Sequence, residues 1–209
     1  MQPGLVRGAG KILAVPRLQA NPSVRGGTRH RLTRRAVGTG YRDPVRIRTA
    51  ELEDWRAIWP FLARIVAAGD TYCWPRNTGE TAARQWWMGK PGGRVYVAVD
   101  SQDGGGAVLG TAELHPNQPA AGSHVANAGF MVAPEAAGRG IGRALAAHVL
   151  DEARRLGYRA MQFNAVVETN TPAVALWQSL GFQILATVPQ AFDHPVHGPV
   201  GLHIMHRLL

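Results

Sequence analysis

The sequence, 209 residues long, predicts an α/β domain that follows a basic N-terminal extension. Three observations support this fold class. Short apolar runs typical of strands alternate with segments whose apolar residues recur every three or four positions, as in helices. The strand-like residues 124–132 lead into Gly138, Gly140 and Gly142 and then into a helical pattern. Finally, residues 1–42 differ sharply in composition from the rest of the chain.

The formal net charge of +9 belongs to the first 42 residues. They hold nine Lys and Arg and no acidic residue, whereas residues 43–209 balance 14 basic residues against 14 acidic ones. We therefore predict an extension at residues 1–42, without stable structure, and a domain at residues 43–209. The extension is interpreted as a solvated tail, an organelle transit peptide or an arm for an anionic partner. The balanced domain argues against nucleic-acid binding by the domain itself, and the basic extension leaves it open.

The first elements follow from alternation and periodicity. Residues 45–48 alternate and predict a strand, and apolar residues from Trp55 to Val66 recur at helical spacing. Pro60 falls inside this helix, so a kink or a division into two helices is expected. A loop carrying Tyr72 and Trp74 follows, and residues 80–88 predict a second helix.

The second part of the chain continues the α/β pattern. The predicted elements are strands at 94–99, 107–114 and 124–132, a helix at 140–156, a strand at 160–167, a helix opened by Thr171 as cap and Pro172, and strands at 182–187 and 201–206. A His- and Pro-rich loop is expected between the last two strands. The predicted order is β-α-α-β-β-β-α-β-α-β-β.

The glycine-rich turn predicts a diphosphate cradle. Glycines allow the backbone to approach a ligand, and the free N–H groups and macrodipole of a helix N-terminus favour an anion. Arg139 and Arg143 add positive charge. The G-x-G-x-G spacing differs from the dinucleotide fingerprint G-x-G-x-x-G, and no nucleotide-triphosphate loop is present. An ordinary glycine-rich turn is the alternative interpretation.

Two motifs resemble those of the GCN5-related N-acetyltransferases (GNAT). The first is Ala137-Gly-Arg-Gly-Ile-Gly142, which resembles the acetyl-CoA motif Q/R-x-x-G-x-G/A except that Ala137 replaces Gln or Arg. The second runs from Asn170 to Phe182 and resembles N-x-x-A-x-x-L/F-Y-x-x-x-G-F. Taken alone, the second motif also fits a capped amphipathic helix. Together, the two motifs extend the resemblance over residues 45–209.

The resemblance implies a fold, a co-substrate and a set of contacts. The implied fold is the acyl-CoA N-acyltransferase fold, a mixed, mostly antiparallel twisted sheet with a central splay and helices on both faces. Acetyl-CoA is the implied co-substrate: strand backbone would pair with its pantetheine arm, and amides of the glycine turn would hold its pyrophosphate. The residues so assigned are Phe130, Met131, Val132, Gly138, Arg139, Gly140, Ile141, Gly142, Arg143, Ala144, Asn170 and Trp177.

Trp177 is the main departure from the family pattern. Most relatives carry a tyrosine there, whose hydroxyl is thought to protonate the leaving thiolate. An indole N–H has no useful acidity, so this general acid is not assigned to residue 177. Trp177 is expected either to pack against the thioester or to belong to the core.

A narrower resemblance concerns Asn127 and Asn164. Their surroundings are similar to those in the yeast azetidine-2-carboxylate (proline-analogue) N-acetyltransferase, where matching asparagines bind the substrate carboxylate and support transfer. We therefore assign both as catalytic. Buried asparagines on strands need hydrogen-bond partners, so two facing one cleft suggest a ligand, the alternative being structural amides that bridge the splay.

The implied function is transfer of an acetyl group from acetyl-CoA to the amine of a small molecule, such as an amino acid or proline analogue, directly in a ternary complex. Tyr72, Trp74 and Glu113 are the expected acceptor-site residues, with Glu113 and His124 as candidate bases. Two alternatives remain: a non-catalytic acyl-CoA-binding module, suggested by Trp177 and Ala137, and an acetyltransferase for protein N-termini or lysines.

Composition bounds the remaining properties. Cys73 is the single cysteine, which excludes an intramolecular disulfide. The eight histidines form no metal-binding pattern, so no metal is predicted. No apolar run is long enough to span a membrane, and a cytoplasmic location is expected. The sequence leaves a homodimer open.

Overall fold

The computed structural model describes residues 45–101 and 106–209. The predictions for residues 1–42 therefore lie outside the described residues, as does the centre of the predicted hairpin loop. The strands are β1 (Val45–Thr49), β2 (Arg94–Asp100), β3 (Val108–Pro116), β4 (Val125–Val132), β5 (Ala160–Val167), β6 (Gln183–His194) and β7 (Gly198–Leu208). The α-helices are α1 (Trp55–Ala68), α2 (Glu80–Met88), α3 (Ile141–Arg155) and α4 (Thr171–Ser179).

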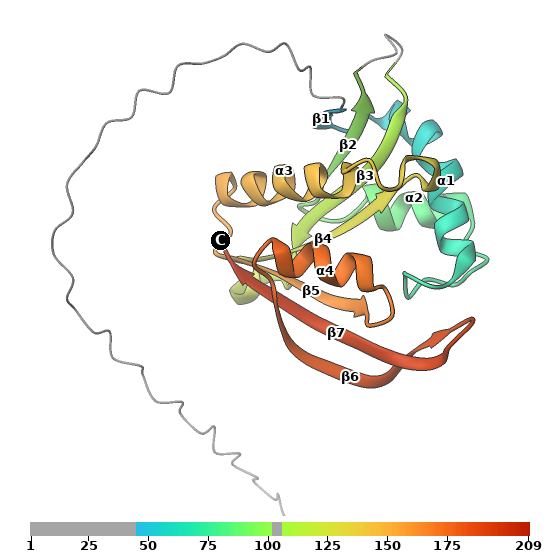
Figure 1. The fold of residues 1–209 in the computed structure, drawn as a ribbon. Helices are drawn as coiled ribbons and strands as arrows, with labels where there is room; N and C mark the ends of the chain where they lie inside the picture. The colour runs from blue at the N-terminus through green and yellow to red at the C-terminus, as the bar shows by residue number, and fades with distance from the viewer. Residues whose placement is uncertain (1–44, 102–105) are drawn as a thin grey trace, which may run out of the picture. The chain divides into compact units, whose positions relative to one another are not determined.

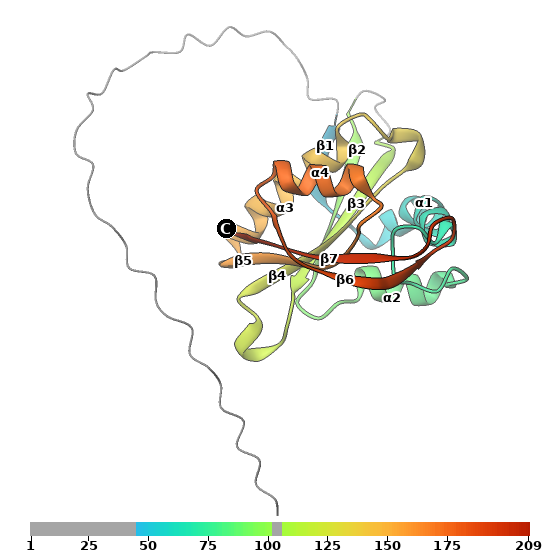
Figure 2. The ribbon, with the colours of Figure 1, turned by 60° about the horizontal axis from the view of Figure 1, so that its bottom comes forward.

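The strands form one sheet in the order β1-β2-β3-β4-β5-β7-β6. Every neighbouring pair is antiparallel except β4 and β5, which are parallel. Helices α3 and α4 lie over one face of the sheet and α1 and α2 over the other (Figures 1 and 2). The mixed, mostly antiparallel sheet and the order of elements confirm the predicted fold.

The core explains why α3 sits where it does. Leu145 and Val149 of α3 are fully buried, as are Ile58 and Leu62 of α1 on the opposite face. These side chains recur at the helical spacing read from the sequence, so each helix buries one stripe against the sheet. This packing fixes the N-terminus of α3 beside the end of β4 (Figure 1). None of the helices in the described part of the chain is long and apolar enough to span a membrane.

Pro60 does not divide the first helix, contrary to one of the two outcomes expected. The helix runs unbroken from Trp55 to Ala68. Pro60 is exposed, and so is Arg56, whose carbonyl would otherwise accept the missing backbone hydrogen bond. Water can therefore satisfy that carbonyl, which reduces the penalty of proline in a helix.

The C-terminal hairpin is longer than predicted. Strands β6 and β7 replace the shorter strands expected at 182–187 and 201–206, and the predicted loop shrinks to residues 195–197. Because β6 is an edge strand, it tolerates Pro189, which cannot donate to the ladder. Its register shifts between Val188 and Phe192, where Gln190 has a φ of 51°. The loop was predicted from a segment rich in His and Pro. Because an edge strand tolerates proline, proline in this segment does not by itself indicate a loop.

Candidate active site

Strands β4 and β5 pair only near their beginnings. The register joins Val125 to Ala160 and Ala126 to Met161 and goes no further. On its other side, β4 stays paired with β3 up to Val132. The edge of β4 that faces β5 therefore has no strand partner along residues 127–132, as the predicted splay requires, and side chains bond the N–H groups of Ala128 and Phe130 there. Such an edge can accept an extended chain as an added strand.

The glycine turn adopts backbone conformations that suit a cradle. Gly138 and Gly140 have φ values of 75° and 78°, which glycine adopts without the steric penalty of other residues. A Cβ placed on either glycine would meet no atom within 4 Å. The chain itself therefore leaves the space above both glycines empty, and a ligand can approach their backbone.

The amides of the turn are largely unused. The N–H groups of Ala137 and Ala144 donate to the carbonyls of Pro134 and Gly140, at 3.2 and 3.0 Å. Residues 138–143 lie between these two. Among the described residues, their N–H groups find no backbone acceptor outside helix α3. The last three of these begin α3, and the first N–H groups of a helix have no partner within it. This row of free donors at a helix N-terminus is suited to an anion.

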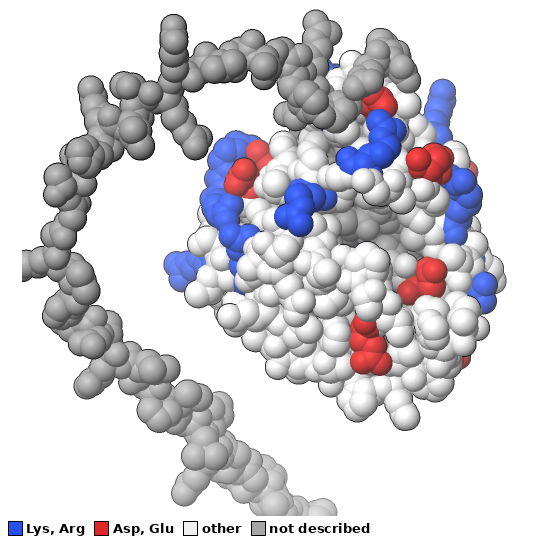
Figure 3. Space-filling view, in the orientation of Figure 1, with Lys and Arg blue, Asp and Glu red and all other residues white. Residues whose placement is uncertain are grey.

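Two arginines border the cradle and are both anchored. Arg139 donates to Asp100 Oδ2 at 3.0 Å, and Arg143 donates to Ser179 Oγ at 2.9 Å. Both side chains are exposed. Figure 3 shows basic side chains above the hollow in the centre of this face. Positive charge therefore accompanies the free amides, which favours an anionic ligand.

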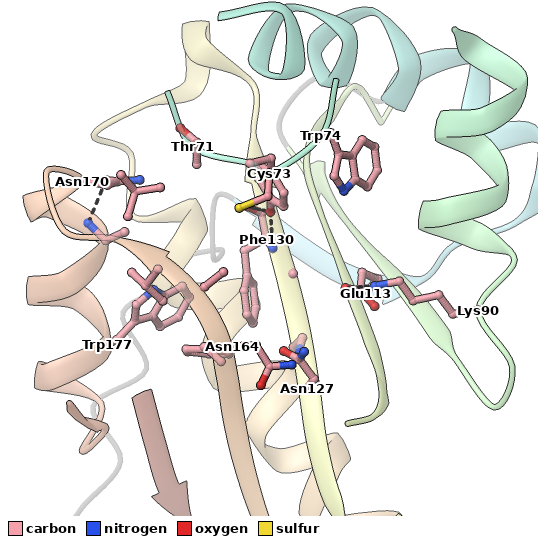
Figure 4. A pocket seen from close by; sticks show the side chains of 18 residues that line it. Thr71, Cys73, Trp74, Lys90, Glu113, Asn127, Phe130, Asn164, Asn170 and Trp177 are labelled. Atoms are coloured by element: carbon pink, nitrogen blue, oxygen red, sulfur yellow. Dashed lines mark hydrogen bonds and ion pairs between the residues drawn. The ribbon is translucent and has the colours of Figure 1, made fainter. Parts of the chain in front are cut away.

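A cavity of about 280 Å³ opens between the diverging strands and the loop after α1 (Figure 4). Its lining residues include Thr71, Tyr72, Cys73, Trp74, Lys90, Glu113, Asn127, Phe130, Phe163, Asn164, Asn170 and Trp177. The predicted acceptor residues thus share one cavity with the predicted catalytic asparagines and with Trp177. His124 is not among the lining residues and is bonded through Nδ1 to the carbonyl of Ala121.

Asn127 and Asn164 lie side by side at one end of the cavity (Figure 4). Asn127 Oδ1 accepts the N–H of Ala128 at 2.8 Å. Asn164 Nδ2 donates to Asn117 Oδ1 at 2.7 Å, and its Oδ1 accepts from Gln162 at 2.9 Å. The two asparagines do face one cleft.

Their expected burial is wrong for Asn164, which is exposed, while Asn127 is half-buried. The reason lies in the register of β5. The pairing with β7 shifts between Phe163 and Val166, so Asn164 sits in a bulge of the strand. Bulges re-aim side chains and often lie beside active sites.

Trp177 packs in an aromatic cluster that lines the cavity. Its ring centroid lies 4.8 Å from those of Phe130 and Phe163, and its side chain is 7% exposed. Phe182 stacks on Phe163 at 4.4 Å. The side chain belongs to the core and also lines the cavity. Its packing in the core is therefore compatible with the expected contact with a thioester.

The cap of helix α4 differs from the prediction. Asn170, not Thr171, is the N-cap, and its Oδ1 accepts the N–H of Ala173 at 3.3 Å. The preference of Asn for this position equals that of Thr or exceeds it. Capping occupies one side-chain atom of a residue that the family resemblance assigns to acetyl-CoA, while Asn170 still lines the cavity.

Two other assigned residues bury their side chains. The side chains of Met131 and Ile141 are 2% and 1% exposed and belong to the core. The backbone of Met131 is paired with Thr111 of β3, so only the N–H of Ile141, at the start of α3, is free to serve a ligand. This fits a mode of recognition in which helix backbone, rather than side chains, makes the contacts.

Glu113 forms a buried charge cluster beside the cavity. Its side chain is 6% exposed, and its Oε1 lies 2.7 Å from Lys90 Nζ. Lys90 Nζ also lies 3.1 Å from His115 Nε2. Glu113 Oε2 is buried and has no hydrogen-bond partner among the described residues. Burial raises the pKa of the Glu113 carboxyl, and the charge of Lys90 opposes that rise.

The loop after α1 is tied to β4 by Tyr72. Its hydroxyl donates to the carbonyl of Phe130 at 2.8 Å and accepts the N–H of Phe130 at 3.0 Å. Burial, reinforced by the charge of Glu113, raises the pKa of this hydroxyl, so it stays protonated. The same burial effect raises the pKa of the Cys73 thiol, which makes it a poor nucleophile.

Lys90, which lines the cavity, and Asn117, which bonds the lining residue Asn164, had no signal in the sequence. Lys90 follows α2 in a short turn, and Asn117 lies in a loop after β3. Neither belongs to a motif, and each acquires its role only by meeting a residue far along the chain. Within residues 45–101 and 106–209, no group of three or more His, Cys, Asp or Glu side chains could hold a metal ion.

The open strand pair above a cradle of free amides defines a domain of the acyl-CoA-binding type. A model of the Acetyltransferase (GNAT) family matches residues 51–182, and the chain belongs to this family. The solved structure of a GCN5-related N-acetyltransferase from Kribbella flavida is 55% identical. It has a TM-score of 0.75 and covers 79% of this chain and 98% of that one.

Two further relatives are informative. A GNAT superfamily phosphinothricin acetyltransferase from Sinorhizobium meliloti, solved in complex with AcCoA, is 25% identical with a TM-score of 0.68, covering 79% of this chain and 89% of that one. The N-acetyltransferase aca1 of Schizosaccharomyces pombe is 40% identical over 86 residues. That match covers 41% of each protein, so the chain spans less than half the length of this curated relative.

Proposed function

We propose that this protein is an acetyl-CoA-dependent N-acetyltransferase that acts on a small-molecule amine. One observation carries the proposal: β4 has no pairing with β5 beyond Ala126, a cavity opens between these two strands, and free amides at residues 138–143 follow the end of β4. Coenzyme A needs all three, because its pyrophosphate, its pantetheine arm and its thioester must be held at successive positions. Membership of the GNAT family and the AcCoA complex of the Sinorhizobium relative support the same co-substrate.

The cavity favours an amino acid or a proline analogue as acceptor. Its volume of about 280 Å³ is small for a cavity that must also admit the thioester end of acetyl-CoA. Trp74 offers an apolar wall, Glu113 offers an anionic group for an ammonium, and Asn127 and Asn164 offer amide N–H donors for a carboxylate. This division of charge matches an amino acid, and it supports the narrower resemblance to the proline-analogue acetyltransferase.

The reaction would proceed directly in a ternary complex. The acceptor ammonium first loses a proton, for which Glu113 is the carboxylate among the residues that line the cavity. The neutral nitrogen then attacks the thioester carbon, forming the C–N bond as the C–S bond breaks. The nitrogen loses its second proton, and the departing sulfur gains one. No covalent enzyme intermediate is needed, consistent with the raised pKa of the Cys73 thiol.

The direct test is to incubate the purified protein with acetyl-CoA and a panel of amines and to follow free thiol. The panel should hold amino acids, cyclic imino acids, simple amines and peptides with free N-termini or lysines. Thiol release with small amino or imino acids is expected. Turnover of peptides alone would indicate a protein acetyltransferase, and binding of acetyl-CoA with no turnover across the panel would indicate a non-catalytic module.

Substitution of the asparagines should separate acceptor recognition from co-substrate binding. Asn127→Ala and Asn164→Ala are each expected to lower kcat/KM for a carboxylate-bearing acceptor about 10- to 100-fold, the loss typical of a hydrogen bond to a charged group. Calorimetry should show unchanged affinity for acetyl-CoA. The amide of the same acceptor, which lacks the carboxylate charge, should be much less affected.

The matched control is Asn77→Ala, which alters an exposed asparagine that does not line the cavity. It should leave both acceptors unchanged. Equal losses for the carboxylate and amide acceptors would show that the asparagines serve the structure of the splay rather than the acceptor.

A further inference from the structure

The hydroxyl of Tyr72 occupies a distinctive position on β4. A single residue, Phe130, gives it both an N–H, at 3.0 Å, and a C=O, at 2.8 Å (dashed line at Phe130 in Figure 4). In a strand, the N–H and C=O of one residue point to the same side. Phe130 lies four residues beyond the last β4 residue that pairs with β5. The Tyr72 hydroxyl therefore stands within the opening of the splay.

This is the part of the splay where the thioester would lie. The open edge of β4 leads from the cradle at residues 138–143 down to Phe130, and the cavity begins there. The ring of Phe130 contacts Trp177, the residue at the family's usual proton-donor position. The Tyr72 hydroxyl, which bonds the backbone of Phe130, thus lines the same cavity as Trp177, which itself cannot supply a proton.

We propose that the Tyr72 hydroxyl is a catalytic residue that relays a proton from the acceptor nitrogen to the departing sulfur. This inference rests on the proposed function. As the C–N bond forms and the C–S bond breaks, the Tyr72 oxygen takes the second proton of the nitrogen. Its own proton passes to the sulfur, so free thiol leaves and the tyrosine is unchanged. The first proton has already gone to Glu113.

The surroundings of Tyr72 suit a relay better than a free acid. Burial, reinforced by the charge of Glu113, raises the pKa of the hydroxyl, so a tyrosinate is disfavoured. A concerted exchange forms no tyrosinate. The other ionisable groups lining this cavity are Cys73, Lys90 and Glu113, and none of them bonds the backbone of Phe130 among the described residues. Among the ionisable groups that line the cavity, the Tyr72 hydroxyl is therefore the one that is bonded to the unpaired edge of β4.

The ring of Tyr72 is held in place by two tryptophans. Its centroid lies 5.9 Å from Trp74 and 6.2 Å from Trp87, both in edge-on contact. Trp87 is anchored in turn, because its Nε1 donates to Thr111 Oγ1 at 3.1 Å. The hydroxyl is thus preorganised by packing, as a group that acts in a transition state must be.

The test is Tyr72→Phe, which removes the hydroxyl and keeps the ring between the tryptophans. With acetyl-CoA and a saturating acceptor, kcat should fall about 100-fold, the lower range for loss of a proton-transfer group. The KM for acetyl-CoA should change less than about threefold. The matched control is Tyr96→Phe, since Tyr96 also has a buried ring and a hydroxyl bonded to one partner, Glu152, outside the cavity. This control should keep kcat.

The outcomes are distinct. If the unaltered protein acetylates no amine, the proposed function fails first. If it does, and Tyr72→Phe retains kcat within about threefold, this inference alone is overturned. Should the substitution impair folding, 3-fluorotyrosine in place of Tyr72 keeps the ring and the hydroxyl but ionises at lower pH. Because fluorine changes the proton affinity of the hydroxyl, kcat should change more than about threefold, and the same replacement of Tyr96 should leave kcat unchanged. An equal kcat in the two variants would overturn the relay.

Discussion

Replacing Gly140 with valine is expected to abolish binding of coenzyme A, with affinity reduced at least about 100-fold, or about 2.8 kcal/mol. Gly140 has a φ of 78°, which a β-branched residue adopts only with strain. Its open side faces the space above the turn, where an added side chain would meet no protein atom but would meet a bound pyrophosphate. Isothermal titration of purified Gly140→Val with coenzyme A measures the loss.

Gly157→Val is the matched control. Gly157 lies just beyond the other end of the same helix, has a φ of 84° and likewise has no atom within 4 Å of an added Cβ. Both substitutions should lower the midpoint of thermal unfolding, because both impose the same backbone strain. Only Gly140→Val should lose coenzyme A. Equal affinity in the two variants would refute the cradle and, with it, the proposed co-substrate.

Lys90→Met is expected to give the second large effect, because it leaves the buried carboxylate of Glu113 without its close cation. An unpaired buried polar group typically costs about 1–3 kcal/mol. The carboxyl pKa is already raised by burial, and removal of the ammonium should raise it further. Stability should therefore fall at neutral pH, measured by urea unfolding.

The sign of the pH dependence follows from linkage. A carboxyl whose pKa is higher in the folded than in the unfolded state destabilises the fold above the folded pKa. That penalty disappears as the pH falls through the folded pKa toward the unfolded one. Lys90→Met should thus regain stability in acid relative to the unaltered protein.

Two controls separate the effect of the lost Lys90 charge from the effect of its lost side-chain packing. Adding Glu113→Gln to Lys90→Met should restore much of the stability at neutral pH, since no buried charge then remains unpaired. Arg154→Met removes an exposed partner of Asp151 and should change stability by less than about 0.5 kcal/mol. A loss in Lys90→Met that is equal at neutral and acidic pH would instead identify the packing of the lysine stem as the cause.

The predictions that succeeded rest on local signals. The glycines at 138, 140 and 142 and the apolar stripe that follows them define a strand, a turn and a helix within about 30 residues. Positive φ at Gly138 and Gly140 is a local property of the backbone, so residue type alone indicates it. The two family motifs are likewise contiguous, which is why the fold was predicted, while binding of a pyrophosphate by the glycine turn stays a prediction.

The predictions that failed concern positions where the tertiary setting overrides local preference. The unbroken helix at Pro60 depends on its exposure, and the long β6 depends on its place at the sheet edge. The exposure of Asn164 depends on a bulge opposite β7. In each case, the deciding neighbour lies elsewhere in the chain or is water, so the segment itself carries no signal.

By itself, the sequence determined the order of the elements, the amide-rich turn and the residue types that a transfer site requires, because periodicity, glycine and capping act over a few residues. Only the tertiary structure decided which groups meet: the Tyr72 hydroxyl with the backbone of Phe130, 58 positions away, and Lys90 with Glu113, 23 positions away. These contacts arise when the sheet and the helices fold together and exclude water. Burial then sets the pKa values that define the chemistry of the site.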